Sequence, residues 1–216
     1  MSLIVSASAG GTIEPIEAGT YTAVCYGLID LGEQYSETYD KWTRKVMLLW
    51  ELPGEKIDLG GDEPVSRTIS KMYTSSLSEK AKLRADLQAW RGRPFTTQEL
   101  AAFDLHAILG VPCLLNIQHR EYKERTFAEI AGIVKMPKGM PVEPVTLAPI
   151  AFDLDTDDLS MLEKLPAWIE ERIKTSRTYE NRVHPQPVTN VAELDDLEAD
   201  AARAENENID DEEIPF

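Results

Sequence analysis

The spacing of apolar residues changes once along this chain, and that change limits the folds it can form. Before it come three segments rich in β-branched and aromatic residues, each bounded by turn residues, at 20–31, 43–52 and 64–74. This pattern predicts three β-strands, with Pro53-Gly54 ending the second. Strand alternation places five side chains of the third on one face: Val65, Arg67, Ile69, Lys71 and Tyr73.

A helical period follows the third strand. Apolar residues recur at helical spacing from Leu77 to Trp90, after a helix start at Ser78 and before a stop at Gly92. A short second helix is predicted over 96–109, capped by Thr96 or Thr97 with Glu99 in its first turn. Two further strands are then predicted at 113–119 and 126–134, joined by the charged turn 120–125.

The order strand–strand–strand–helix–strand–strand predicts a mainly β (α+β) domain, a five-stranded OB-type barrel with its helix between strands three and four. An SH3-like barrel or a generic α+β sheet has a similar strand count, but neither explains a long helical insertion at that point. Trp50, on an apolar strand, and Trp90, on the apolar side of the helix, are expected in the core.

The rest of the chain differs in composition. Prolines at 137, 141, 144 and 149 indicate an extended connection, and 153–177 predicts one helix or a helical hairpin with the apolar stripe Leu162, Leu165, Trp168, Ile169 and Ile173. From 185 onward the chain cannot bury enough apolar surface to offset its ordering entropy, which predicts disorder. The predicted parts are an N-terminal arm (1–18), the OB-type domain (19–140), a connection with a helical extension (141–184) and an acidic tail (185–216).

Charge is distributed unevenly along the chain. It carries 22 Lys and Arg against 38 Asp and Glu, a net charge of −16, yet residues 41–140 sum to +4 and residues 191–216 to −10. The net charge of −16 argues against a simple basic protein that coats nucleic acid and against a protein that binds anionic membranes. A mildly basic middle followed by a strongly acidic end instead points to an interaction tail.

Targeting and redox signals are weak. No apolar run is long enough to span a bilayer, and the first residues lack the basic region of a secretory signal. Cys25 and Cys113 form neither a disulfide framework nor a zinc-binding spacing, and buried free thiols are expected. We therefore expect no membrane partner and a reducing, cytoplasmic compartment.

The acidic run ends in an apolar tip. We expect Phe216 to fill an apolar pocket on a partner, with its carboxylate free and the backbone restrained by Pro215. A basic rim would contact the acidic residues before it. A tail that only solubilises would leave the apolar residues unexplained. The predicted partner-binding residues are Asp210, Asp211, Glu212, Glu213, Ile214, Pro215 and Phe216.

The segment Asp-Asp-Glu-Glu-Ile-Pro-Phe at 210–216 resembles the tip of bacterial and bacteriophage single-stranded DNA-binding proteins. Residues 70–77, 87–95, Phe103-Asp-Leu and Leu109-Gly are similar to phage and prophage proteins of this kind, over roughly 19–135. The resemblance implies an OB fold that coats single-stranded DNA and an acidic tail that recruits replication or recombination proteins. It also implies the cytoplasm of a host cell if the chain is phage-encoded.

The predicted domain carries three clusters suited to single-stranded DNA, which is held by basic grooves interleaved with aromatic stacking platforms. They fall on strands two and three and on the turn after strand four, where OB folds bind their ligands. The predicted nucleic-acid-binding residues are Trp42, Arg44, Lys45, Arg67, Lys71, Tyr73, Arg120, Tyr122, Lys123 and Arg125.

No pattern in the chain indicates catalysis. The three histidines share no ligand spacing with one another or with cysteine, and no phosphate-binding loop or nucleophile elbow is present. We therefore expect no catalytic residue, metal or cofactor. Our first hypothesis is a single-stranded DNA-binding protein without marked sequence preference, a homodimer being left open. The alternatives are a protein-interaction module, an acidic DNA mimic and, last, an enzyme.

Overall fold

The computed structural model describes residues 14–61, 63–123 and 125–185. The strands are β1 (Gly19–Ser36), β2 (Lys41–Ile57), β3 (Val65–Thr74), β4 (Pro112–Tyr122), β5 (Arg125–Lys135) and β6 (Ile150–Phe152). The helices are α1 (Lys82–Arg91), α2 (Thr97–Ala101), α3 (Ala167–Lys174) and α4 (Arg177–Val183), with 3₁₀ helices η1 (Leu105–Ile108) and η2 (Leu159–Lys164). Described residues up to Glu180 belong to one compact unit, and Asn181–Pro185 belong to a second.

The strands form one sheet in the order β3-β2-β1-β4-β5, with antiparallel neighbours throughout. Short β6 runs parallel to β1, pairing at Gly27, Leu28 and Ile29. This confirms a mainly β fold with α1 between the third and fourth strands. Among the described residues no pairing joins β3 to β5, so the sheet does not close into the predicted barrel by strand pairing.

Both faces of β2 are buried, and two separate cores result. On one face Leu48 and Trp50 pack with α1 and the remaining long strands. The ring centroids of Trp50 and Trp90 lie 5.9 Å apart, and both residues are in the core, as expected. On the opposite face Met47 and Leu49 pack with the extension after residue 150. Because strand side chains alternate, only a continuous apolar run can fill both cores. We call the face of β2 that carries Leu48 and Trp50 the inner face, and the face that carries Met47 and Leu49 the outer face.

The two cysteines lie in the inner core. Cys25 and Cys113 are fully buried free thiols on neighbouring strands, as expected. Burial raises the pKa of Cys25 to about 12, and it raises the pKa of Cys113 further still. At neutral pH both therefore act as small apolar core residues rather than as nucleophiles.

Two predicted boundaries are wrong for local reasons. Pro53-Gly54 does not end β2, because the strand continues past a register shift between Leu52 and Lys56. A proline at such an irregularity removes no ladder hydrogen bond. The first helix starts at Lys82 rather than at Ser78, whose carbonyl instead accepts a turn hydrogen bond. Its predicted stop is confirmed, since Gly92 adopts φ 68° and donates to two helix carbonyls.

The second predicted helix divides into two pieces. Its start is confirmed by a capping box between Thr96 and Glu99. Ala102 then takes an extended conformation that ends α2, and Asp104 begins η1 by accepting a hydrogen bond from the His106 N–H. The continuous helix predicted over 96–109 is therefore wrong, because the short Asp104 side chain caps a new turn in its middle.

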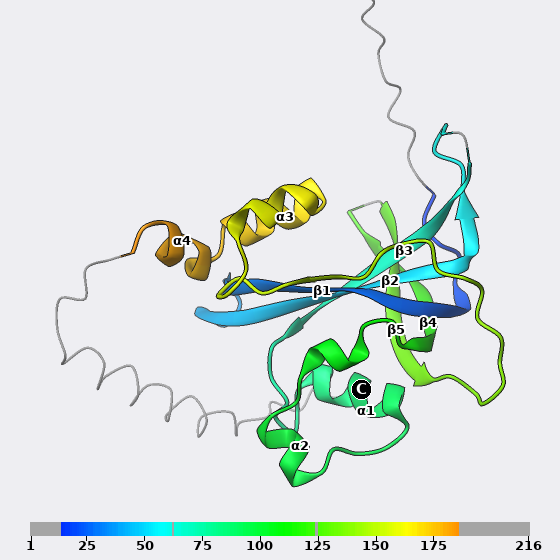
Figure 1. Ribbon diagram of the computed structural model, residues 1–216, viewed down its shortest axis with the longest axis horizontal. Coiled ribbons are helices and arrows are strands. Elements are labelled where there is room, and N and C mark those ends of the chain that lie inside the picture. Colours follow the sequence, from blue (N-terminus) through cyan, green and yellow to red (C-terminus); the bar gives the residue numbers. More distant parts are fainter. Residues whose placement is uncertain (1–13, 62, 124, 186–216) are drawn as a thin grey trace, which may run out of the picture. The chain divides into compact units, whose positions relative to one another are not determined.

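The extension covers the outer face of β1 and β2 with η2 and α3, on the side of the sheet opposite α1 and α2 (Figure 1). The predicted apolar stripe is confirmed for the four residues that are buried there: Leu162, Leu165, Ile169 and Ile173. Trp168 is the exception, with 52% of its surface exposed. Within the described ranges, no helix has both the length and the apolar character needed to cross a membrane.

A buried carboxylate holds the connection 141–149 to the outer face. Glu51 is fully buried and accepts hydrogen bonds from the N–H groups of Thr146 (2.9 Å) and Leu147 (3.0 Å) and from the Thr146 hydroxyl (2.8 Å). Burial alone would raise the pKa of Glu51, but these hydrogen bonds outweigh it and lower the pKa. The ionised form therefore stabilises the fold.

We expect Glu51→Gln to destabilise the fold by about 1–3 kcal/mol at pH 7, because the amide has one acceptor oxygen for three donors. A lowered folded-state pKa adds stability above the unfolded-state value, roughly pH 4.3, and that stability is lost as the pH falls through the folded-state pKa. Urea unfolding at pH 7 and at pH 3.5 should therefore show a smaller difference between wild type and variant at the lower pH. An equal difference at both would contradict this role.

Candidate nucleic-acid interface

The tip of the β1–β2 hairpin presents three exposed aromatic rings, which we call the aromatic cluster. Tyr35, Tyr39 and Trp42 are 48%, 73% and 38% exposed. The Tyr35 and Trp42 rings pack at 5.4 Å, and the tight turn is closed by Asp40 in the left-handed region (φ 50°). Exposed rings on a protruding hairpin form a surface on which planar ligands can stack.

Cations surround this cluster. The Lys41 ammonium lies 5.9 Å from the centroid of the Tyr39 ring, and the Arg177 guanidinium lies 5.6 Å from that of Trp42. Arg177 is itself held by two hydrogen bonds to the Glu33 carboxylate, at 2.8 and 3.0 Å. The rings of the hairpin therefore lie beside two cations, of which Arg177 is paired with Glu33.

The β4–β5 hairpin carries a second basic and aromatic surface. Its turn passes through Lys123 at φ 47°, and Arg120, Lys123 and Arg125 are all exposed. Arg120 pairs across the strands with Phe127, which is 47% exposed. Arg120 forms an ion pair with Glu129, at 4.0 Å. Tyr122 belongs to β4, but its side chain lies outside the described residues.

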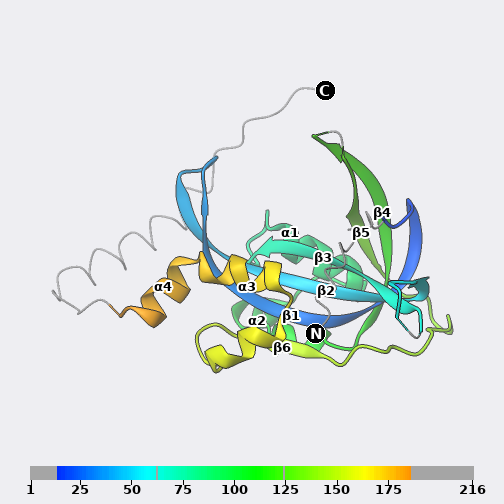
Figure 2. The ribbon, with the colours of Figure 1, turned by 90° about the horizontal axis from the view of Figure 1, so that it is seen from above.

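The two hairpins rise on the same side of the molecule (Figure 2). Between the open edges of β3 and β5 lies a groove of about 1220 Å³. Its walls include Arg67 from β3 together with Arg125 and Phe127 from β5, and Ile57 and Leu59 from the end of β2 add apolar surface. The Arg67 guanidinium also donates to the backbone oxygen of Glu14. One side of the fold therefore holds the exposed rings of both hairpins together with the cations Lys41, Arg67 and Arg125.

Two predicted nucleic-acid-binding residues at the base of the β1–β2 hairpin, Arg44 and Lys45, contact other side chains of the fold. Arg44 forms ion pairs with Asp30 and, at 2.7 Å, with Asp155, and the hydrogen bond to Asp30 raises its pKa. Lys45 donates to the Thr74 hydroxyl at 2.7 Å. Arg44 is thus neutralised by carboxylates, whereas Lys45 keeps a neutral partner and can still attract an anion.

The structure contradicts the prediction for Lys71 and Tyr73, because their shared face of β3 points inward. Tyr73 is 3% exposed, and its hydroxyl donates to Asp86 of α1 at 3.0 Å. The Lys71 ammonium donates to the same carboxylate at 2.9 Å and to the Ile130 carbonyl at 3.1 Å. A buried ring cannot stack on a base, and an ammonium paired with a carboxylate attracts a phosphate only weakly. Neither residue therefore belongs to the candidate interface.

Three ring-bearing residues of the interface were not predicted from the sequence: Tyr35, Tyr39 and Phe127. Each lies next to a predicted element, Tyr35 and Tyr39 in the loop between the first two strands and Phe127 at the start of the fifth. For Tyr35 and Tyr39 the available signal was their place in a predicted hairpin turn, since turns seldom bury aromatic residues. The predicted partner-binding residues, Asp210 to Phe216, lie outside the described residues.

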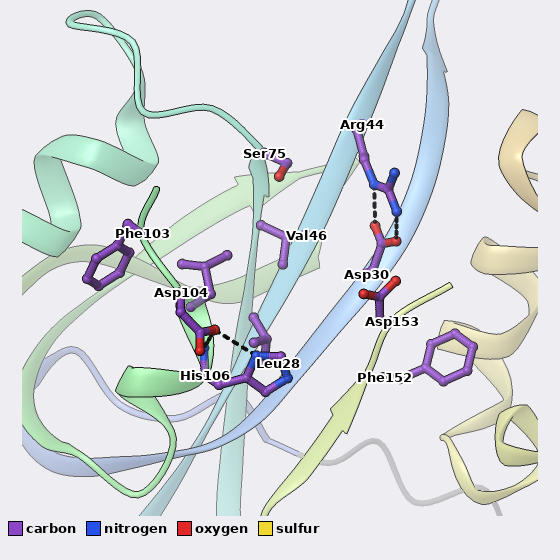
Figure 3. A pocket seen from close by; sticks show the side chains of 11 residues that line it. Leu28, Asp30, Arg44, Val46, Ser75, Phe103, Asp104, His106, Phe152 and Asp153 are labelled. Atoms are coloured by element: carbon purple, nitrogen blue, oxygen red, sulfur yellow. Dashed lines mark hydrogen bonds and ion pairs between the residues drawn. The ribbon is translucent and has the colours of Figure 1, made fainter. Parts of the chain in front are cut away.

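A separate cavity of about 240 Å³ lies between η1 and β6 (Figure 3). His106 Nδ1 lies 2.8 Å from Asp104, whose pKa is lowered by hydrogen bonds from the His106 backbone and ring. Across the cavity Asp30 is bound by Arg44 and Asp153 is close by (Figure 3). These charged groups cap turns or pair with one another.

Over the described ranges, no group of three or more His, Cys, Asp or Glu side chains could hold a metal ion. No protein-family model matches the chain, and no curated protein is similar enough to it to count as a relative. The geometry of the two hairpins and of the groove is therefore the basis for assigning a function.

Proposed function

We propose that this chain binds single-stranded DNA without marked sequence preference, across the side that carries both hairpins and the groove. The observation that carries the proposal is the placement of exposed rings and cations on two hairpins that rise on one side of the fold. Stacking on aromatic rings is tolerant of sequence because every base has a π-face, and cations beside the rings attract phosphates.

The proposal includes an OB-type fold. Supporting it are the strand order β3-β2-β1-β4-β5, the helix between β3 and β4, and the approach of the two outer strands, where Lys71 donates to the Ile130 carbonyl at 3.1 Å. OB folds bind oligonucleotides over strands two and three and the loops after strands one and four. The proposed surface occupies the corresponding elements.

The proposed cellular role is to protect single strands during replication or recombination. The acidic segment 191–216 would recruit other proteins of those processes, and this part of the proposal rests on the sequence alone. A second candidate function is protein binding. Exposed apolar residues in the groove favour it, since Leu59 and Val65 are 59% and 47% exposed beside the open edge of β3.

Charge removal on the β4–β5 hairpin tests the proposal. Replacing Arg120 and Arg125 with glutamine should lower the slope of log affinity against log salt for oligo-dT by about 1.4, because each phosphate contact adds about 0.7 for single strands. The slope is measured by fluorescence anisotropy between about 50 and 300 mM salt, a range over which counterion release changes the affinity strongly. Arg93→Gln with Lys138→Gln removes the same charge outside the interface. Equal slopes for all proteins would contradict the assignment of this hairpin.

A further inference from the structure

Helix α3 borders the outer face of β3. Ile169 and Ile173 are fully buried against the outer core, which fixes the position of the helix. From the same helix, the Arg172 guanidinium reaches the Met72 sulfur of β3 at 3.8 Å. Met72 is 40% exposed, so this contact lies at the surface rather than in the core.

Arg172 completes a group of cations that we call the outer cationic patch: Lys41, Lys45 and Arg172. Lys45 pairs across the strands with Thr74, two residues after Met72, so Lys45 and Arg172 approach the same end of β3. The pKa of Lys45 is lowered first by partial burial and then by the charges of Lys41 and Arg172. The Lys45 ammonium is bound to the neutral Thr74 hydroxyl. In the described part of the chain, neither Lys45 nor Arg172 forms an ion pair with a carboxylate. Like charges held together without a counterion favour the binding of an anion.

Trp168 lies next to this patch. It precedes Arg172 by four residues on α3, and side chains four apart lie on the same face of a helix. Its ring is 52% exposed, although the neighbouring Ile169 is fully buried. The backbone beneath it is held firmly, since the Gln34 side chain donates to the Arg172 carbonyl at 2.9 Å. A fixed helix thus presents a large ring and a cation on one flank.

We propose that α3 forms an additional wall of the single-strand site, in which Trp168 stacks on a base and the outer cationic patch binds the adjoining phosphates. The inference rests on the proposed function and extends it to the segment 141–184. The occupant is the same DNA strand, because a ring beside uncompensated cations complements a base beside a phosphate. The outer cationic patch begins at Lys41, next to the aromatic cluster, so the two surfaces are continuous.

Three single variants of the full-length protein test this wall. Trp168→Ala should weaken the binding of labelled oligo-dT about tenfold, the usual loss for one stacked base. Arg172→Gln should lower the salt slope by about 0.7. Lys174→Gln is the matched control, since it removes a cation from the same helix that is paired with Glu170 at 2.6 Å. It should leave both quantities unchanged. Thermal unfolding of each variant verifies that the fold is intact.

Photocrosslinking of the wild type gives a readout that needs no variant. An oligo-dT containing 5-iododeoxyuridine should crosslink to a peptide containing Trp168. Suppose that the wild type binds oligo-dT, the variants bind equally well and this peptide stays unmodified. The assignment of α3 to the single-strand site is then wrong, and the proposed function is retained. If the wild type does not bind oligo-dT at low salt, both are wrong.

Discussion

Replacing Tyr39 and Trp42 together with alanine should weaken the binding of single-stranded DNA by about two orders of magnitude, because each stacked base adds about 1–3 kcal/mol. Tyr39 is 73% exposed, so its ring adds little to the stability of the fold. Trp42 packs on Tyr35 and lies beside Arg177, and its loss should loosen the hairpin tip without reaching either core. Fluorescence anisotropy with labelled oligo-dT at fixed salt measures the effect.

Phenylalanine at both positions is the matched control. It keeps an aromatic face at each position, with a smaller ring in place of the Trp42 indole, so affinity should stay within about threefold of the wild type if stacking is the cause. A loss of less than threefold for the double alanine variant, with an unchanged melting temperature, would contradict the role of the aromatic cluster.

The second large effect is expected on stability. Asp86→Ala should lower the free energy of unfolding by about 3 kcal/mol, because it leaves the Lys71 ammonium unpaired in a largely buried site. Asp86 is 6% exposed and accepts hydrogen bonds from both Lys71 and Tyr73, so one carboxylate ties α1 to β3. Urea unfolding followed by circular dichroism measures the change.

Lys82→Ala is the control for this network. Lys82 also pairs with Asp86, at 3.3 Å, but its side chain is 63% exposed, and exposed ion pairs add less than about 1 kcal/mol. The two variants should therefore differ by roughly 2 kcal/mol or more. If Asp86→Ala is no less stable than Lys82→Ala, the network does not hold α1 in place.

The order of strands and the inserted helix could be predicted because their signals are local. Apolar composition and turn residues mark each strand, and Gly92 ends α1 by its own backbone conformation. The pairing of β6 with β1 could not be predicted, since Ile150-Ala-Phe152 is three residues long and joins a strand more than a hundred residues away. Short segments gain their structure from the surface they meet.

The candidate interface was predicted less well, and β3 shows why. Alternation correctly grouped Arg67, Lys71 and Tyr73 on one face, but a face that mixes apolar and cationic side chains does not reveal whether it points inward. That depends on Asp86, which lies in another element and provides the buried partner for Lys71. The exposed ring of Tyr35 was missed because β1 extends to Ser36, beyond its apolar run.

Binding of single-stranded DNA by the full-length wild type tests the central claim most directly. A labelled oligo-dT is titrated by fluorescence anisotropy at low and at moderate salt, with unlabelled duplex DNA as competitor. Binding should weaken steeply with increasing salt, and an excess of duplex should not displace the labelled strand. No binding at low salt, or full displacement by duplex at equal nucleotide concentration, would contradict it.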